Sequence, residues 1–559
     1  MAEPATTSST TKATATAAAG AVLLTLATAQ FLMTLDSSVM NVSMATVADD
    51  LGTTITGIQT AITLYTLVMA TLMITGGKIG TIIGRRKAFA IGCVIYGAGS
   101  LVTGASPTLG VMIVGWSFLE GIGAALILPA IVALVAGNFA PAERPKAYGL
   151  VAAAGAIAVA AGPLIGGLAT TYASWRYVFF GEVVLVVAIL FLSRRVADAP
   201  SEGHHRLDLT STLLSVLGLG TAVFGVLRSS EWGWITPKPG GAAWFGISPT
   251  FWLIVIGLFV VWLFFVWQHR LIRNGKEPLV DPALLAVPQL TGGLLMFFFQ
   301  FLLQAGVFSS VPLFLAVVLE LSALDTGLRV MPLSRALLVA AAGVPKVWPR
   351  ARPRLVVRVG LLLMLGGILA LLSGIELDAN AGVVALPMVL IGLGMGALSS
   401  QLGAVTVSSV PTEQSGDVGG LQNTATNLGA SIGTALAGSV MIAVLTSTAL
   451  SGINASTAIP ASVQDQATVE LASGIPFVSD TQLEEALADD GLSTQASDDI
   501  LEANREARVQ GLDAALGVLA VIAVISLFFT RRIPAVPVGD EGTDEAIDGA
   551  AAGAPPDRS

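Results

Sequence analysis

Residues 155–167 read Gly-Ala-Ile-Ala-Val-Ala-Ala-Gly-Pro-Leu-Ile-Gly-Gly, within an uncharged run from Ala147 to Thr171. The run is long enough to cross a lipid bilayer as one helix. At about 100° per residue, Gly155, Gly162 and Gly166 fall within roughly 20° of one line along that helix. Because this line carries no side chains, we expect another helix to approach it closely.

The composition is that of a membrane protein. Of 559 residues, 54% are hydrophobic and 12% charged, whereas soluble proteins carry about 25% charged residues. The one cysteine, Cys93, lies in an apolar run, which excludes an intrachain disulfide and a cysteine-based metal site. We expect no metal and no cofactor, because the three histidines lie in polar connections. The basic residues lie beside apolar segments and the net charge is −9, so no nucleic-acid partner is expected.

Fourteen apolar segments follow one another in the order six, two, six. They predict an all-α membrane protein with two six-helix bundles, at 20–194 and 291–530, and a linker with two extra transmembrane helices at 195–290. Residues 1–19 and 531–559 have the composition of disordered tails. The expected spans are 20–41, 55–76, 88–105, 109–137, 146–170, 175–194, 209–228, 249–269, 291–319, 325–345, 354–375, 381–406, 417–446 and 511–530.

Basic residues cluster at alternate connections, so that every cluster falls on one side of the membrane. By the positive-inside rule that side is the cytoplasm, and both termini of a multi-pass cell-membrane protein lie there. The one long connection, 447–510, is then extracellular and acidic. We expect a helical hairpin over the outer mouth from Thr481 to Arg508, broken at Asp489-Asp490-Gly491. A lid or a partner site is the alternative to a passive acidic loop.

The pair Gly162-Pro163, followed by Gly166-Gly167, resembles the antiporter motif C of drug-exporting members of the major facilitator superfamily. Pro163 removes one backbone hydrogen bond and is expected to bend this helix. Other stretches resemble motifs of the fourteen-helix drug:proton antiporter branch, namely LDSSVMNV (35–42), GKIGTIIGRRK (77–87), GIGAA (121–125), WRYVF (175–179) and GLQNT (420–424). The gating residues that the resemblance implies are Gly77, Thr81, Gly84, Arg85, Arg86, Gly155, Gly162, Pro163, Gly166 and Gly167.

The chain departs from the family pattern at informative positions. In the stretch 77–87, which resembles the family's cytoplasmic motif A, the family's aspartate is Thr81. That acid normally faces a helix N-terminus, where the helix dipole favours negative charge, so we expect the inward gate to be held less firmly. The arginine and glutamine of motif B align with Ser117 and Glu120, and an asparagine of the sixth span aligns with Glu182. Proton coupling by the usual arrangement is therefore not expected, although carboxylates have appeared nearby.

Ionisable residues inside membrane spans are costly and are functional candidates. We expect Asp36, Glu120 and Glu182 to share one wet cavity, where protons and a cationic substrate compete for the carboxylates, with Glu120 as the main carrier. As alternatives, Asp36 stabilises neighbouring helices and Glu182 faces the outer vestibule. Arg335, the only basic residue deep in a span, is expected to pair with an acid, and Glu120 is a plausible partner.

Methionine, aromatic and amide side chains suit a cavity that accepts several lipophilic shapes. In membrane proteins such residues more often pack against helices or lipid. The candidate cavity residues are Met33, Met40, Trp116, Phe297, Gln300, Gln304 and Asn423.

The resemblance implies a proton-driven exporter of lipophilic, cationic drugs by alternating access. Its partners would be the bilayer, a small lipophilic substrate and protons. Two alternatives stay open: transport of a specific endogenous solute such as a lipid, peptide or metabolite, and a non-transporting sensor. The sequence contains no metal cluster, phosphate cradle, nucleophile elbow or ATP-binding motif, so an enzyme or a primary pump is not expected.

Overall fold

The computed structural model describes residues 7–198, 207–238, 241–376, 379–471, 477–488 and 493–537. Regular structure in these ranges is helical apart from one isolated bridge between Trp244 and Ile247. Among the described residues, fourteen helices are long and apolar enough to cross a membrane. Their number and order confirm the fold class expected from the sequence.

The first half of the chain forms the helices α1 (Thr7–Asp50), α2 (Ile55–Ile83), α3 (Arg85–Gly104), α4 (Leu109–Met112), η1 (Ile113–Glu120), α5 (Gly121–Asn138), α6 (Arg144–Tyr172) and α7 (Arg176–Ser193). The segment η1 is π-helical, and α4, η1 and α5 together make one apolar span. The middle of the chain forms α8 (Leu209–Leu227), α9 (Ser229–Trp232), α10 (Pro249–Arg273) and η2 (Pro282–Ala286).

The remaining helices are α11 (Pro288–Leu313), η3 (Phe314–Val318), α12 (Ala323–Val347), α13 (Pro353–Leu372), η4 (Ala381–Val384), α14 (Ala385–Val407), η5 (Thr412–Gln414), α15 (Ser415–Ala455), α16 (Ala461–Glu470), α17 (Asp480–Leu487), α18 (Thr494–Phe529) and η7 (Thr530–Arg532). Several helices are capped at their N-terminus, where a side-chain oxygen accepts a hydrogen bond from a backbone N–H of the first turn. Thr54 accepts from Gly57, Asp208 from Ser211 and Ser493 from Ala496.

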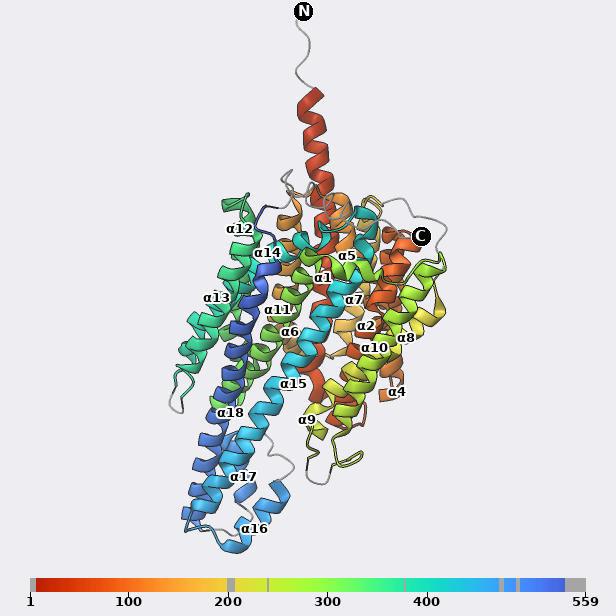
Figure 1. Cartoon of the computed structure of the whole chain (residues 1–559). Coiled ribbons are helices and arrows are strands. Elements are labelled where there is room, and N and C mark those ends of the chain that lie inside the picture. Colours follow the sequence, from red (N-terminus) through yellow and green to blue (C-terminus); the bar gives the residue numbers. More distant parts are fainter. Residues whose placement is uncertain are drawn as a thin grey trace, which may run out of the picture.

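Two apolar cores lie one in each half of the molecule. The first includes Leu26, Ile127 and Ile189, and the second includes Val307, Met364 and Leu516. The halves meet where α6 packs against α12 and α14, and where α15 packs against α2 and α5 (Figure 1). The extra helices α8 and α10 pack on each other, and α8 also contacts α2 and α15.

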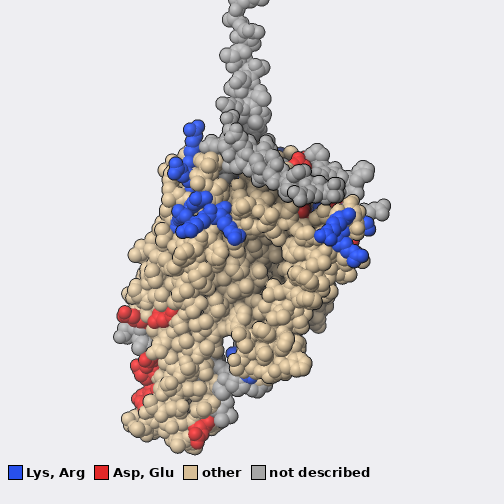
Figure 2. All heavy atoms as spheres, viewed as in Figure 1, with Lys and Arg blue, Asp and Glu red and all other residues tan. Residues whose placement is uncertain are grey.

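Charge separates the two ends of the helix bundle. Lysine and arginine side chains gather mainly at the end where α1 begins and α18 ends, and acidic side chains extend along the opposite end, although a few of each sign lie at the other end (Figure 2). We call the first the basic end, which includes Lys78 and Arg144, and the second the acidic end, which includes Glu320 and Asp480.

Two expectations about the tails were wrong. Helix α1 begins at Thr7, so residues 7–19 are helical, and residues 1–6 lie outside the described part. After the last span, Ile533 is fully buried and its carbonyl accepts a hydrogen bond of 2.7 Å from Nε of Arg354. The expected disorder beyond residue 537 concerns residues that are not described.

The long connection at the acidic end is shorter than expected because α15 and α18 continue beyond the predicted spans, to Ala455 and from Thr494. Helices α16 and α17 lie between them. Asp480 at the start of α17 pairs with Arg508 and, at 2.7 Å, with Arg505. Helical structure after Thr481 is thus confirmed, whereas the predicted break at 489–491 lies outside the described residues.

Candidate functional site

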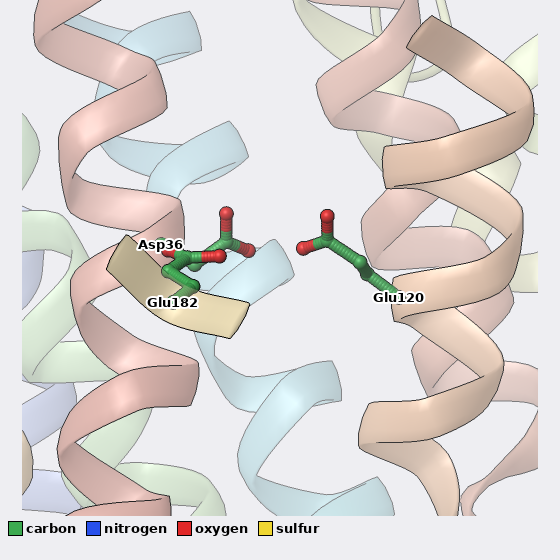
Figure 3. A group of neighbouring side chains, drawn as sticks. All are labelled: Asp36, Glu120 and Glu182. Atoms are coloured by element: carbon green, nitrogen blue, oxygen red, sulfur yellow. The ribbon is translucent and has the colours of Figure 1, made fainter. Parts of the chain in front are cut away.

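Three buried carboxylates meet in the N-terminal half. Asp36 comes from α1, Glu120 from the end of η1 and Glu182 from α7, and each side chain is at most 1% exposed. One oxygen of each carboxylate lies within 4.8 Å of one oxygen of both others. The three groups point toward one another (Figure 3). The structure thus brings the three acids together, and Glu182 is buried, so the alternative that it faces an outer vestibule is wrong.

Asp36 is held by an aromatic pair. The indole Nε1 of Trp116 donates to both of its oxygens, at 2.8 and 3.0 Å. The ring of Trp116 is stacked on Tyr65 with centroids 4.9 Å apart. Trp116 therefore positions the carboxylate. The sequence had suggested it as a cavity residue, and that expectation is wrong.

The two glutamates each receive one hydroxyl hydrogen bond of 3.1 Å, Glu120 from Thr103 and Glu182 from Ser100. Their other oxygens, Oε2 of Glu120 and Oε1 of Glu182, are buried without a hydrogen-bond partner. No ion pair among the described residues involves any of the three acids. All ligand atoms of the cluster are therefore oxygens, and no basic side chain among the described residues balances the charge of its carboxylates.

Local backbone geometry places Glu120 in this cluster. A π-helical turn, a feature frequent at functional sites, runs through η1 and ends at Glu120. On α3, a Cβ added at Gly99 would lie 2.6 Å from Cγ of Glu120. The glycine thus makes room for the glutamate, and a larger residue there would displace it.

Sequence reasoning missed two tyrosines of this site. The hydroxyl of Tyr96 on α3 lies next to all three carboxylates, and that of Tyr65 on α2 lies next to Asp36. Both side chains are at most 2% exposed, and neither hydroxyl makes a hydrogen bond of regular geometry among the described residues. The chain has only 5 tyrosines, so a tyrosine within an apolar span was a usable signal.

A central cavity of about 420 Å³ lies between the halves. It is lined by five of the seven predicted cavity residues: Met33, Phe297, Gln300, Gln304 and Asn423. Met40 and Trp116 do not line it and instead pack in an apolar cluster with Tyr65. A second cavity of about 760 Å³ shares Thr34, Ser37 and Gln304 with the first and also reaches Pro312 and Thr326. The two cavities adjoin at these shared residues, and the second extends to the end of α11 and the start of α12.

The described lining of both cavities contains no aspartate, glutamate, lysine, arginine or histidine. The expectation that the three acids face this cavity is therefore wrong. On α1, Asp36 belongs to the acid cluster, whereas its neighbour Ser37 lines the cavity. Polar groups of the cavity are hydroxyls and amides, the latter from Gln30, Gln300, Gln304, Gln422, Asn423 and Asn427.

The predicted pairing of Arg335 with Glu120 is also wrong. Arg335 is exposed, whereas Glu120 is completely buried. Cavity residues of α12, such as Leu333, lie on the opposite face of the helix, and Arg335 shares its face with Val339, which is 65% exposed. The pairing argument relied on depth along the span and did not consider which face the side chain occupies.

The basic end is closed between the halves. Lys78 and Thr81 on α2 both reach Asp417 at the start of α15, at 3.6 and 3.4 Å. A Cβ at Gly77 would lie 2.5 Å from the carbonyl oxygen of Gly416. The cavity is therefore shut off at this end.

Other residues of the same loop also hold this closure. Nη2 of Arg85 donates to the carbonyl of Glu413 in η5 at 2.9 Å. The turn between α2 and α3 is fixed by Gly84, with φ of 96°, a conformation that favours glycine. Two residues after Gly84, the backbone N–H of Arg86 donates to Asp198 at 3.2 Å.

The glycine line of α6 lies against another helix, as the sequence predicted, and that helix is α1. A Cβ at Gly162 would overlap the side chain of Ser38, and one at Gly166 would lie 3.2 Å from Val39. A Cβ at Gly155 would lie 3.4 Å from Thr34, whereas Gly167 has nothing within 4 Å. Helix α6 continues through position 163, and the side chain of Pro163 lies outside the described part.

Comparison with known proteins gives consistent matches. A family model described as Major Facilitator Superfamily matches residues 26–434. The puromycin resistance protein pur8 of Streptomyces alboniger is 31% identical over 424 residues, covering 75% of this chain and 81% of that protein. The tetracenomycin C resistance and export protein of Streptomyces glaucescens is 28% identical over 425 residues, covering 75% of each chain.

Solved structures agree in fold. The proton:xylose symporter XylE superposes with a TM-score of 0.55 at 12% identity, covering 96% of this chain and 99% of that one. The human organic anion transporter MFSD10 gives 0.55 at 13% identity, covering 92% and 98%.

Proposed function

Because the chain belongs to the major facilitator superfamily, we propose that it is a proton-driven secondary exporter of lipophilic drugs. Support comes from relatives that are named for resistance to, or export of, puromycin and tetracenomycin C. The two halves, 20–194 and 291–530, would rock about the shared cavity, while the linker 195–290 adds two membrane helices.

We place the basic end in the cytoplasm, with both termini there, in the cell membrane. With this orientation the structure is closed toward the cytoplasm at Lys78 and Asp417, and its cavity continues outward. This is the state in which an exporter releases its substrate and takes up protons.

The observation that carries the proposal is the position of the acids relative to the cavity. Asp36 and Ser37 are neighbours on α1, yet one belongs to the buried acid cluster and the other to the cavity wall. Protons on the carboxylates and substrate in the cavity would therefore both act on helix α1. Because each ligand can bias the same movement of α1, exchange needs no direct competition for one carboxylate.

The cavity also revises the expected substrate. Its described lining has amides but no charged side chain, so no acid stabilises a cationic cargo. Oε1 of Gln300, whose side chain is 2% exposed, is buried without a partner and can accept a hydrogen bond from a substrate. We propose that neutral lipophilic molecules with hydroxyl or amide groups are the main substrates.

The test is transport by the purified full chain in liposomes with an imposed pH gradient. We expect a neutral lipophilic dye to accumulate and the accumulation to collapse when nigericin dissipates the gradient. Transport that does not depend on the pH gradient would contradict the proposal that protons drive export. A complete lack of transport would favour a non-transporting sensor. A stronger response to a permanently cationic dye would contradict the assignment of neutral substrates.

A further inference from the structure

We propose that Asp36, Glu120 and Glu182 also form a binding site for a small hard cation such as Na⁺ or Ca²⁺. The proposed function assigns protons to the same three carboxylates, and the cation would compete with those protons. Only this competition rests on the proposed function. Binding of a cation is measurable on the protein at rest, independently of transport.

The spacing of the carboxylates fits such an ion. One oxygen from each acid lies within 4.8 Å of the other two. An ion placed equally far from three such oxygens would lie at most about 2.8 Å from each, close to the range of roughly 2.3–2.6 Å typical of calcium–oxygen bonds. A contraction of a few tenths of an ångström would complete the contact. The convergence of the groups is visible in Figure 3.

The site has free ligand atoms beyond those that its own hydrogen bonds use. Oε2 of Glu120 and Oε1 of Glu182 have no partner. The hydroxyl of Tyr96, on a side chain that is 0% exposed, lies next to all three carboxylates and makes no regular hydrogen bond. All these atoms are oxygens. An all-oxygen ligand set suits hard cations, whereas zinc and copper sites normally include histidine or cysteine.

Charge compensation points the same way. The cluster is faced by hydroxyl and indole groups, none of them positively charged: Tyr65 from α2, Ser100, Thr103 and Tyr96 from α3, and Trp116 from η1. Ionised carboxylates in a buried, low-dielectric site need a counter-charge, which here must be protons or a bound cation. Mg²⁺ normally keeps several of its waters when it binds to a protein. It fits this site poorly, because none of the three acids lines a described cavity that could hold those waters.

The experiment measures binding of radioactive Na⁺ and, separately, Ca²⁺ to the purified full chain in detergent at alkaline and acidic pH. K⁺, Mg²⁺ and choline serve as competitors. We expect saturable binding of one of the two ions near one per chain. Acidification and the competing unlabelled ion should displace it, whereas Mg²⁺ and choline should not.

Variants separate this site from adventitious binding. Glu182→Gln and Tyr96→Phe keep the side-chain size and should weaken binding by about tenfold or more, as loss of even supporting groups does at metal sites. Asp513→Asn removes an acid of α18 outside the cluster and should leave binding unchanged. Size-exclusion chromatography of each variant verifies that it is folded.

Two outcomes would overturn the inference. One is the absence of saturable binding of either ion at alkaline pH. The other is binding that persists unchanged in Glu182→Gln while that variant remains folded. If proton-driven transport is normal while cation binding is absent, the cluster carries protons alone, and the proposed function stands without the cation site.

Discussion

Lys78 of α2 and Asp417 of α15 form an ion pair between the two halves, with Nζ 3.6 Å from Oδ2. Asp417 lies in the first turn of its helix, where the dipole favours a negative charge. Thr81, which stands where the family has an acid, donates to the other oxygen of Asp417 at 3.4 Å. The carboxylate of this closure thus comes from α15, so the argument from Thr81 alone for a looser gate does not hold.

Replacing Asp417 with asparagine should open the basic end. The variant loses the ion pair with Lys78, and we expect the conformational equilibrium to shift by about 1–3 kcal/mol, or roughly 5- to 150-fold. A cysteine at Asn427, which lines the central cavity, reports the shift by its labelling rate from the basic-end side. The native Cys93 is 1% exposed and should contribute little background.

Two controls accompany this variant. Exchanging the charges, with Lys78→Asp and Asp417→Lys together, should restore slow labelling. Thr81→Ala removes only the long hydrogen bond and should change the rate by less than about threefold. A labelling rate unaffected by Asp417→Asn would show that the pair does not hold this end closed.

Gly162→Ala should disrupt the contact between α6 and α1, because the added methyl group would overlap Ser38. Small-to-large changes at such a close approach cost about 1–3 kcal/mol, so thermal stability and transport should both fall. Gly167→Ala is the matched control, since nothing lies within 4 Å of the added carbon. Equal effects of the two substitutions would argue against a close approach of α1 at Gly162.

Glu120→Gln should separate coupling from substrate binding. It removes one ionisable group of the acid cluster without touching the cavity wall. We expect uptake driven by a pH gradient to fall by at least about tenfold, while the dissociation constant for a neutral dye changes less than about twofold. Arg335→Gln, on the exposed face of α12, should behave as the parent protein. Normal gradient-driven uptake by Glu120→Gln would exclude Glu120 as a proton carrier.

Gln300→Leu should weaken binding of substrates that donate hydrogen bonds. The side chain lies in the cavity wall, donates to Ser399 at 3.0 Å and leaves Oε1 free. Loss of that acceptor is expected to cost about 1–1.5 kcal/mol, or roughly five- to tenfold in affinity. Equilibrium binding of two dyes that differ only in a hydroxyl group measures this. If both dyes lose affinity equally, Gln300 acts through packing alone.

The acidic end should loosen in acid. The backbone N–H and the hydroxyl of Thr481 hydrogen-bond the Glu320 carboxylate and lower its pKa. Because the lowered pKa belongs to the folded state, this contact stabilises α17 above the ordinary carboxyl range and is lost as the pH falls from about 5 to 3.

A spin label at Glu484 on α17 measures the effect, and its mobility should rise over this range of pH. In Glu320→Gln the mobility should be higher at neutral pH and should depend less on pH. The same acid-induced rise in that variant would assign the transition to other carboxylates of this region.

Residue patterns along single helices were sufficient for much of the fold. The apolar segments predicted all fourteen spans, and the spacing of Gly155, Gly162 and Gly166 predicted the face of α6 that meets a neighbouring helix. The ends of α15 and α18 were missed because their extensions are polar, and a span prediction stops where apolar character stops. Charged and polar residues are equally compatible with a helix outside the membrane.

The site was less predictable because it depends on contacts between helices. The sequence placed Asp36, Glu120 and Glu182 in spans, but it did not show that their carboxylates meet outside the lining of the cavities. It showed neither the π-helical turn before Glu120 nor the stacking of Trp116 on Tyr65, since neither follows from residue propensity. These features depend on the register between neighbouring helices, which a single sequence does not reveal.

Helix α15 is long enough to extend well beyond the membrane, so its tip would amplify any rotation of the C-terminal half. Its 41 residues extend for about 60 Å, roughly twice the thickness of the hydrocarbon layer, and start at the basic end. The surplus projects from the acidic end beside α18, braced where Asp480 pairs with Arg508. If this half turns by roughly 15° during a cycle, a point about 40 Å from the pivot moves by about 10 Å. A fluorophore pair spanning that tip and α9 would therefore register each turnover as a large change in energy transfer.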